Sequence, residues 1–331
     1  MPNTPPLEQN DNRDNLSSPS KAIKTAIVGL PNTGKSLVFN NLTGKYALVA
    51  NYPLTTVEMK RACCRIHGEL YEMIDTPGLR CLCIHSEEEL VVRDMLFSEK
   101  PDILIQCINA NQLKQSLALT IDLLELGIPM IISLNAVDET KKKGIWIDST
   151  GLSCHVGVPV IESNAMSGLG TDQLKRALPK ARLGKWHVTY GDIIEGRLPI
   201  IASVIPEEVQ YRKKAAALLL LDDPFFAKGL TQKYGPKIMD PLTEEVKRTK
   251  EQLRANIGII INNKRNRWVD AVVENVIKRQ RTTPGTFSKG LGRLSRHPVF
   301  GIPILLLVIF VMYFLVVNVA NGICAQLKPP S

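Results

Sequence analysis

The chain has 331 residues, of which 44% are hydrophobic and 22% charged, and its net charge at pH 7 is +9. This length and apolar content allow about two domains with buried cores and exclude a wholly disordered chain. Seven cysteines without a repeating spacing argue against a disulfide framework and favour a reducing compartment. Residues 1–20 hold no apolar run, so we expect a disordered tail there and no secretory signal.

The first folded part is predicted to be a nucleotide-binding domain over residues 21–184. The apolar run AIKTAIVGL leads into the turn GLPNTGKS, and KSLVFNNLTG is typical of a helix that ends at Gly44. GLPNTGKS has the P-loop spacing, in which backbone amides wrap a β-phosphate, Lys35 neutralises phosphate charge and the Ser36 hydroxyl binds Mg²⁺. The predicted phosphate loop comprises Gly29, Leu30, Pro31, Asn32, Thr33, Gly34, Lys35 and Ser36.

Strands and helices then alternate along the chain. Strand-like runs are expected at residues 57–66, 70–75, 102–110, 130–137 and 158–163, and helices at residues 88–97, 112–126 and 172–181. Strands that alternate with helices favour an α/β fold whose mostly parallel sheet is covered on both faces.

Three further motifs close predicted strands. In DTPG the Asp75 carboxylate can hold Mg²⁺ through water, and the Gly78 amide can sense a γ-phosphate. In NAVD the Asp138 carboxylate can accept two hydrogen bonds from guanine, and in ESNAMSGLG the Ala165 amide can contact the guanine carbonyl oxygen. Together these motifs predict a GTP/GDP site with Mg²⁺, which also contains Thr76, Pro77, Asn135, Ala136, Val137, Ser163 and Asn164.

Beyond about residue 184 the strand signal fades. Helical patterns such as EEVQYRKKAAALLLL predict a helical subdomain over residues 185–281, followed by a basic juxtamembrane linker over residues 282–297. No charged residue stands between Val299 and Leu327, which predicts a transmembrane helix over residues 298–322 and a short tail over residues 323–331. A buried or hairpin helix is the alternative. Lys289, Arg293 and Arg296 precede the span, so we expect a single-pass protein of the inner (cell) membrane with cytoplasmic N-terminal domains.

From about Lys21 to Gln326 the chain resembles the N-terminal part of the bacterial ferrous iron transport protein B (FeoB) family. The similar stretches are GLPNTGKSLVFNNLTG, NYPLTTVE, YEMIDTPGL followed by SEEELVVRDML, LNAVDE and RHPVFGIPILLLVIF. The resemblance implies a P-loop (Ras-like) GTPase domain, a small all-helical domain that damps nucleotide release, and a first membrane helix. It also makes Thr56 the switch threonine that reaches Mg²⁺ and adds Leu54 and Thr55 to the nucleotide site. Leu54 stands where the family usually has glycine, and Asn164 replaces a common serine.

GTP hydrolysis is expected to be slow, because Leu79 stands where Ras-like enzymes carry a water-orienting glutamine. The resemblance implies that Asn32 binds a K⁺ ion that supplies the charge of an arginine finger, whereas the alternative is that Asn32 only shapes the turn. The predicted catalytic residues are Lys35, Thr56, Gly78 and Asn32. The predicted metal ligands are Ser36, Thr56 and Asp75 for Mg²⁺, and Asn32 for K⁺.

In the FeoB family a polytopic region conducts Fe²⁺, and no such region follows the single apolar segment of this sequence. One helix has no lumen, so we expect the chain to regulate ferrous iron uptake through a separately encoded membrane permease subunit or another FeoB-type membrane component. A small Feo accessory protein and a homo-oligomer are further partners to consider. The residues expected to pack against the membrane partner, or else to mark the ends of the span, are Gly301, Tyr313, Asn318, Asn321 and Gly322.

Two other interpretations concern the basic residues and the cysteines. The basic surface also suits an RNA- or ribosome-associated assembly GTPase, but no RNA-binding module is evident after Gly184, so no nucleic-acid partner is expected. A metal site would draw on the motifs ACC and CLCIH, but their spacing matches no strong zinc or iron–sulfur pattern. We therefore favour small apolar cysteines over metal ligands at Cys63, Cys64, Cys81 and Cys83, with His85 nearby in sequence.

Overall fold

The computed structural model describes most of the chain. The described residues are 22–44, 48–51, 57–83, 86–185, 189–209, 211–221, 223–253, 256–279, 294 and 301–326. They belong to two compact units, Met1–Arg279 and Gln280–Ser331. Three predicted site residues, Leu54, Thr55 and Thr56, lie outside the described residues, and so do His85 and most of the basic linker.

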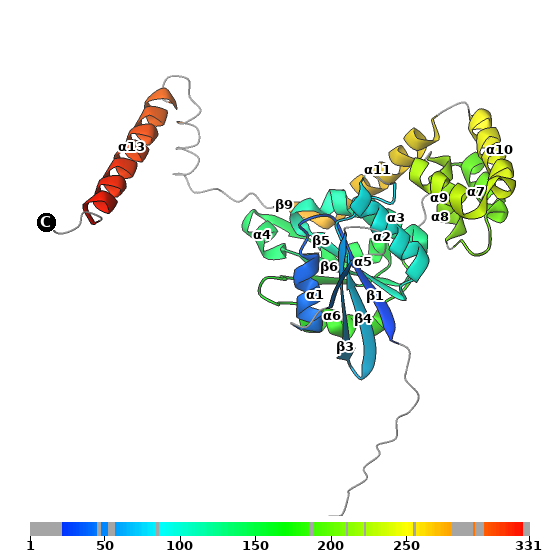
Figure 1. Ribbon diagram of the computed structural model, residues 1–331, viewed down its shortest axis with the longest axis horizontal. Helices are drawn as coiled ribbons and strands as arrows, with labels where there is room; N and C mark the ends of the chain where they lie inside the picture. The colour runs from blue at the N-terminus through cyan, green and yellow to red at the C-terminus, as the bar shows by residue number, and fades with distance from the viewer. Residues whose placement is uncertain are drawn as a thin grey trace, which may run out of the picture. The chain divides into compact units, whose positions relative to one another are not determined.

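Within the described residues of the first unit, seven strands form one sheet in the order β2-β3-β4-β1-β5-β6-β8 (Figure 1). β1 is flanked by parallel β4 and β5, and β6 and β8 continue in parallel, whereas β3 runs antiparallel to β2 and β4. The predicted mostly parallel sheet is therefore confirmed, with an antiparallel edge. The strands are β1 (Ile23–Val28), β2 (Leu48–Asn51), β3 (Glu58–Ile66), β4 (Glu69–Asp75), β5 (Ile103–Asn109), β6 (Met130–Asn135) and β8 (Val160–Ser163).

Helices cover both faces of this sheet, because successive side chains of a strand point to opposite faces. On β1, Ala26 and Val28 pack into one apolar cluster with α2, α3 and α5, while Ile27 packs into a second cluster with α1 and α6. The helices are α1 (Lys35–Thr43), α2 (Glu87–Glu99), α3 (Leu113–Leu126), α4 (Val137–Lys142), α5 (Ser149–Val156) and α6 (Thr171–Ala177), with short 3₁₀ turns η1 (Ala110–Gln112) and η2 (Leu178–Lys180).

One predicted boundary is wrong at the NAVD motif. The run expected to be strand up to Val137 ends at Asn135, and α4 begins at Val137. The reason is Ala136, whose φ of 60° lies in the left-handed region and turns the chain out of the sheet. This turn places Asp138 in the first turn of a helix beside the end of β6 rather than in the strand itself.

A group of helices follows the sheet, as predicted for residues 185–281. Figure 1 shows α7 to α10 gathered together, with α11 running from them along the helices of the sheet. The apolar residues of α11, such as Ile261, Val269 and Val272, join the same buried cluster as α2 and α3. These helices are α7 (Asp192–Val204), α8 (Arg212–Leu220), α9 (Pro224–Tyr234), α10 (Pro236–Leu253) and α11 (Ile257–Val276).

A small second sheet ties the end of α11 to the domain that carries the NAVD motif. β9 (Ile277–Arg279) follows α11 directly and pairs antiparallel with β7 (Ile145–Ile147). The amide of Asp148 also donates to the carbonyl of Val276 at 2.9 Å. On the other side of β7, the Lys141 ammonium of α4 lies 5.5 Å from the centroid of the Trp146 ring. The first unit therefore ends beside α4.

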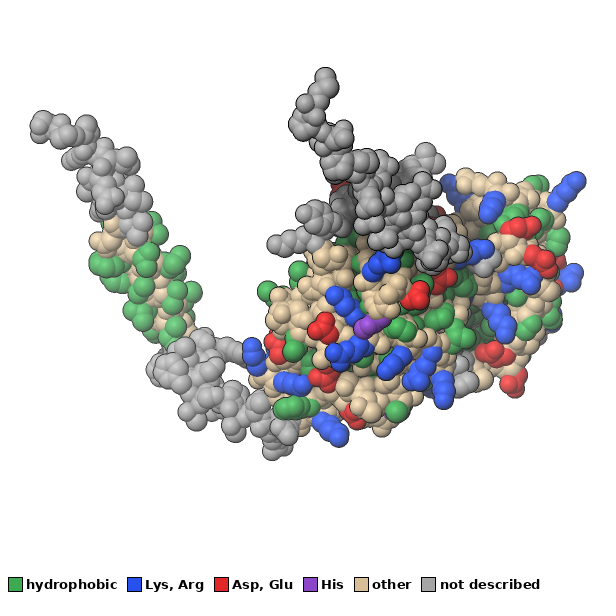
Figure 2. All heavy atoms as spheres, turned by 90° about the horizontal axis from the view of Figure 1, so that it is seen from below, with side chains coloured by type: hydrophobic (Ala, Val, Ile, Leu, Met, Phe, Trp, Pro, Cys, Tyr) green, Lys and Arg blue, Asp and Glu red, His purple; other side chains and the backbone are tan. Residues whose placement is uncertain are grey.

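The second unit contains α13 (Gly301–Gln326). Its segment Gly301–Asn318 is long and apolar enough to cross a membrane, and its side chains are largely exposed (Figure 2). Pro303 falls in the first turn, where a missing amide costs little. The Asn318 amide donates to the carbonyl of Phe314 at 2.8 Å, so this predicted packing residue satisfies its donor within the helix. The predicted apolar helix is thus present over Gly301–Gln326, and residues 298–300 of the predicted span lie outside the described residues.

Candidate nucleotide-binding site

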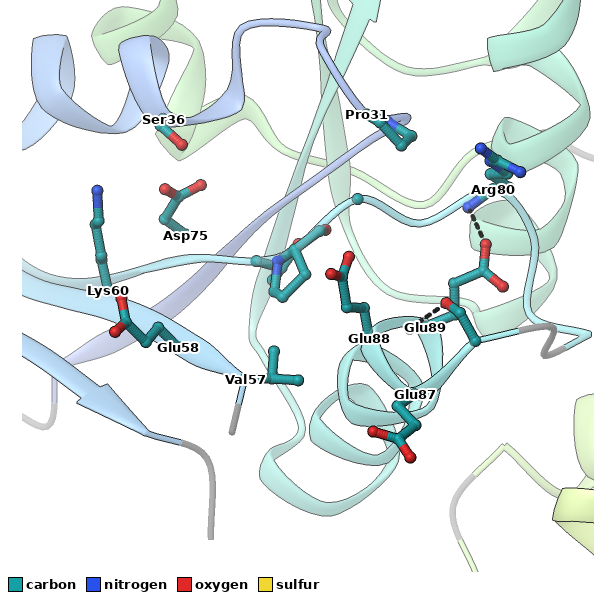
Figure 3. A pocket seen from close by; sticks show the side chains of 14 residues that line it. Pro31, Ser36, Val57, Glu58, Lys60, Asp75, Arg80, Glu87, Glu88 and Glu89 are labelled. Carbon is teal, nitrogen blue, oxygen red and sulfur yellow. Dashed lines mark hydrogen bonds between the residues drawn. The ribbon is translucent and has the colours of Figure 1, made fainter. Parts of the chain in front are cut away.

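A cavity of about 810 Å³ opens where β1 and β4 end at the edge of the sheet. Ser36 of α1 and Asp75, the last residue of β4, line it, and so do Pro77 and Gly78 of the DTPG motif. Figure 3 shows the hydroxyl of Ser36 and the carboxylate of Asp75 facing each other across this cavity. The structure therefore brings the phosphate loop and the DTPG motif together, as predicted.

Two glycines allow close packing at the phosphate loop: Gly34 within the loop, and Gly78 of the DTPG motif beside it. Gly34 has a φ of 92°, and a Cβ there would meet the Asn135 amide nitrogen at 2.4 Å. A Cβ on Gly78 would meet the Cγ of Pro31 at 2.6 Å, so the DTPG backbone lies directly against the phosphate loop. Asn32 also adopts a positive φ, 61°, and its side chain is exposed. That conformation is common for asparagine in turns.

Lys35 is buried, and its ammonium donates to the carbonyl of Leu30 at 2.9 Å. Burial lowers the pKa of Lys35, while the negative charges of Asp75 and Glu88 act in the opposite direction. A phosphate group would restore a full counter-charge to this ammonium. The Lys35 side chain is therefore buried inside the phosphate loop, close to the place where the loop amides would bind an anion.

Asp75 provides the test of whether Mg²⁺ fits this site. Its Oδ1 atom is buried and has no hydrogen-bond partner among the described residues. Burial raises the pKa of Asp75, whereas a hydrogen bond from Ser36 and the charges of Lys35 and Lys60 lower it. A buried carboxylate oxygen without a partner beside a serine hydroxyl is a suitable donor set for a hard divalent cation. Ser36 and Asp75 therefore fit Mg²⁺.

Asn135 joins three of the predicted motifs. Its side-chain amide donates to the carbonyl of Thr33 at 3.0 Å, and its Oδ1 accepts the amide of Ala165 at 2.9 Å. Asn41 of α1 adds a bond from its side chain to the carbonyl of Ala165 at 2.8 Å. The phosphate loop, NAVD and the ESNAMSGLG loop are thus bonded to one another, and Asp138 lies beside them in α4.

Two predicted contact residues have other partners in this arrangement. Ser163 is the last residue of β8, and its buried hydroxyl lies 2.9 Å from the hydroxyl of Ser133 in the neighbouring strand β6. The Ala165 amide, expected to contact guanine, already donates to Asn135, so a guanine carbonyl would have to share this donor. Leu79 is fully buried in the core.

Several residues that line the cavity were not predicted from the sequence. They include Glu58 and Lys60 of β3, Arg80, and three acidic residues that begin α2, Glu87, Glu88 and Glu89. In Figure 3 the Glu89 carboxylate accepts the amide of Arg80, at 3.2 Å. The acidic run SEEE after DTPG is the signal that could have indicated them, although such a run is also the ordinary start of a helix.

The segment after DTPG is clamped by two buried ion clusters at Leu82. The Leu82 amide donates to Asp122 of α3 at 3.0 Å, and its carbonyl accepts from Arg93 of α2 at 3.4 Å. Arg93 also forms an ion pair with Asp223, the N-cap of α9, at 2.8 Å, and Asp122 pairs with Lys214 of α8 at 2.6 Å. The backbone of one residue, Leu82, is therefore connected through Asp122 and Arg93 to two helices of the helical part.

The second cluster contains more charges. Arg265 of α11 pairs with Asp122 at 3.1 Å and with Glu125 at 2.7 Å, and it donates to the hydroxyl of Tyr190, which also bonds Glu125. Burial alone would raise the pKa of Asp122, but the charges of Lys214 and Arg265 lower it. The cations therefore keep this buried carboxylate ionised.

Among the described residues no group of three or more His, Cys, Asp or Glu side chains is placed to hold a metal ion. Burial raises the pKa of Cys81 to about 12 and that of Cys83 to about 11, so both remain thiols at neutral pH. The Cys81 thiol donates to the carbonyl of Cys83 at 2.7 Å, a local contact within the loop.

Comparison with known proteins confirms the resemblance. Residues 23–178 match the family described as ferrous iron transport protein B. The chain is 29% identical to the Fe(2+) transport protein A/Fe(2+) transporter FeoB fusion protein of Porphyromonas gingivalis, covering 88% of this chain and 36% of that protein. It is 27% identical to the Fe(2+) transporter FeoB of Escherichia coli K12, covering 92% and 40%. The chain thus spans roughly two fifths of the length of these relatives.

Solved structures agree with the fold. The cytosolic domain of the T. maritima FeoB iron transporter in a GDP form superposes with a TM-score of 0.64 at 28% identity, covering 78% of this chain and 100% of that one. An S. thermophilus NFeoB mutant bound to GDP gives a TM-score of 0.66 at 28% identity, covering 77% and 99%. The T. maritima domain in its GMPPNP form gives 0.63 at 28% identity, covering 77% and 99%. The sheet and helices of this chain therefore have the FeoB G-domain fold.

Proposed function

We propose that this chain binds GTP and GDP with Mg²⁺, hydrolyses GTP slowly, and uses the nucleotide state to regulate ferrous iron transport at the cell membrane. The observation that carries the proposal is the convergence of the predicted motifs: Asn135 bonds the phosphate loop and the ESNAMSGLG loop to NAVD, while the phosphate loop and DTPG line one cavity. The relatives with this fold are named as Fe²⁺ transporters, and their solved domains include GDP and GMPPNP forms. None of the matches described above is an RNA-associated protein, which disfavours the alternative.

The residues act as a phosphate site whose parts respond to the third phosphate. The loop amides and Lys35 bind the phosphates, with Lys35 exchanging the Leu30 carbonyl for a phosphate oxygen. Ser36 and Asp75 would hold Mg²⁺, which when bound would neutralise negative charge on the phosphates. Gly78 lies against Pro31 without room for a Cβ, so its backbone is next to the phosphate loop, where its amide can contact a γ-phosphate. Thr56 is proposed as the second switch ligand from the resemblance alone.

Potassium dependence is the finer part of this proposal. Replacing Na⁺ by K⁺ at equal ionic strength is expected to raise the GTPase rate by about tenfold or more, because a cation beside the phosphate loop would supply the positive charge that an arginine finger supplies in Ras-like enzymes. The Asn32→Ala variant is expected to lose this response, since Asn32 is the proposed ligand. Phosphate release would be measured on the full chain in detergent.

Asn40 provides the matched control for this experiment. It is an exposed asparagine on α1, near Asn32 in sequence, and Asn40→Ala should retain the K⁺ response. Equal rates in the two salts, or a K⁺ response that persists in Asn32→Ala, would reduce Asn32 to a residue that shapes the turn.

The contacts of the Leu82 backbone provide a route by which the nucleotide could affect the helical part of the protein. Leu82 lies four residues beyond Gly78 in the sequence. Its amide nitrogen and carbonyl oxygen bond Asp122 and Arg93, whose side chains form ion pairs with Lys214 of α8 and with Asp223, the N-cap of α9. A shift of the DTPG segment therefore has to strain or rearrange two buried ion clusters. Because buried pairs tolerate poor geometry badly, such a shift would move the helical part as a body.

The membrane step is proposed from α13. Its 26 residues correspond to about 39 Å of helix, more than the roughly 30 Å of a bilayer's hydrocarbon core. The helix therefore suits a tether that holds the GTPase at the membrane surface beside a polytopic, FeoB-type Fe²⁺ permease component. A small Feo accessory protein and self-association are further partners consistent with the resemblance.

Photocrosslinking in native membranes tests this step. With a photoreactive amino acid at Tyr313, exposed on α13, we expect a polytopic neighbour whose crosslinking yield differs between GDP and a non-hydrolysable GTP analogue. Deletion of the gene should also impair ferrous iron uptake. Self-crosslinks alone together with normal uptake would contradict the regulatory role while leaving GTP hydrolysis untouched.

A further inference from the structure

Asn164 occupies an unusual position in the predicted base-binding loop. Its side-chain amide nitrogen donates to Oδ1 of Asp138 at 3.1 Å. Its side-chain oxygen accepts the amides of Met166 at 3.1 Å and Ser167 at 3.2 Å. One side chain thus uses its donor on the carboxylate and its acceptor on the loop.

Asp138 has few other constraints. It lies in the first turn of α4, half-buried, after the left-handed turn at Ala136. Among the residues that the structure describes, Asn164 is the one side chain that bonds this carboxylate. The torsion that orients a carboxylate is broad, so an unbonded Asp138 would rotate freely.

Orientation matters because guanine presents two parallel donors, the ring N–H and the 2-amino group. Each needs one carboxylate oxygen, and both oxygens must lie in the plane of the base to accept them. The bond from Asn164 uses one lone pair of Oδ1, which leaves the second lone pair of that atom and all of Oδ2 for the base. Asn164 and guanine can therefore bond Asp138 together.

We propose that Asn164 is a specificity-determining positioning residue, which acts through Asp138 to hold the carboxylate in the orientation that lets the 2-amino group of the base contribute to binding. The proposal rests on the proposed binding of guanine nucleotides. It adds that recognition of the 2-amino group depends on a residue outside the NAVD motif. Asn164 is suited to this role because an amide both donates and accepts, so it fixes the carboxylate and closes its own loop at once.

The test compares GDP with inosine diphosphate, which lacks only the 2-amino group. For the full chain in detergent we expect GDP to bind about tenfold or more tightly than inosine diphosphate, the usual scale of a hydrogen bond to a charged group. Asn164→Asp keeps the size and the loop acceptor but loses the donor, so the ratio should fall to about one to three. Asn164→Ser retains a donor hydroxyl and should restore most of the ratio.

The ratio separates positioning from folding. A variant that only loosens the loop weakens both nucleotides by the same factor and leaves the ratio unchanged, and that result would overturn the proposal. If Asn164→Asp does not fold, Asn164→Ala removes the donor without adding charge and carries the same prediction. Ser167→Ala is the control, because its hydroxyl makes only a 3.4 Å bond within the loop, and it should leave the ratio unchanged.

Failure of the underlying function would look different. If the unaltered chain bound neither GDP nor inosine diphosphate, or bound ADP equally well, the proposed guanine site itself would be wrong. If the unaltered chain preferred GDP but every Asn164 variant kept the full preference, only the role of Asn164 would be rejected.

Discussion

Replacing Asp138 with asparagine is expected to weaken GDP binding by about 100-fold or more. Guanine offers two donors to this residue, and an asparagine amide turns one acceptor into a donor, so one charge-assisted bond is lost and two donors face each other. Xanthine carries a carbonyl in place of the 2-amino group and can accept from the new amide. The same variant should therefore bind xanthosine diphosphate more tightly than the unaltered chain does.

Glu139 is the control for this change. It is the next residue of α4, exposed, and its carboxylate accepts from Asn111 at 2.8 Å, away from Asn164. Glu139→Gln makes the same chemical change and should leave both affinities unchanged. Equilibrium titration with fluorescent nucleotides would measure all three proteins, and an Asp138→Asn variant with unchanged GDP affinity would refute the guanine assignment.

Removing the Arg93 guanidinium is expected to cost about 3–5 kcal/mol of folding stability, because it breaks a buried ion pair by deleting one partner and leaves the charge of the other, Asp223, in the interior. The two side chains are 2% and 1% exposed, and their charged atoms are 2.8 Å apart. Arg93→Ala would also open a void beside Phe226, over whose ring the guanidinium lies at 5.2 Å. Thermal unfolding of the full chain in detergent should show a midpoint lowered by about 10 °C.

Arg248 shows how little the same deletion should matter elsewhere. It pairs with Glu244 at 3.2 Å one helical turn away, and both side chains are more than half exposed. Arg248→Ala should change stability by about 0.5 kcal/mol or less, since water screens such pairs. In Arg93→Ala, additional replacement of Asp223 by Asn should recover part of the loss, because it removes the buried charge that Arg93 balances in the unaltered chain. Equal effects of the two arginine deletions would show that the buried Arg93–Asp223 pair does not stabilise the protein as expected.

The sequence predicts the parts of this site that depend on local patterns. The P-loop, DTPG and NAVD each consist of a few consecutive residues after an apolar run, so their contribution to one edge of the sheet follows from strand order alone. The limits of the strands follow less well, as at NAVD, where a single left-handed residue, Ala136, ends the strand early.

The contacts between distant segments could not be predicted in this way. Arg93 and Asp223 are 130 positions apart, and each is an unremarkable polar residue in its own helix. β7 and β9 have three residues each, too few for a periodic pattern, and each becomes a strand only because the other lies beside it. The bond from Asn164 to Asp138 likewise depends on the close approach of two loops.

The pairing of β9 with β7 also determines how the molecule would bear a mechanical load. β9 ends at Arg279, the last residue of the first compact unit, so a pull on the chain beyond that point acts first on three strand residue pairs. The other side of this ladder leads through α4 to Asp138. A small tension would therefore act through β7 and α4 on the region of Asp138. A larger tension would break the pairing of β9 with β7 before it unfolded α11. The β7–β9 pair would therefore transmit a small force to the nucleotide site and would separate under a larger one.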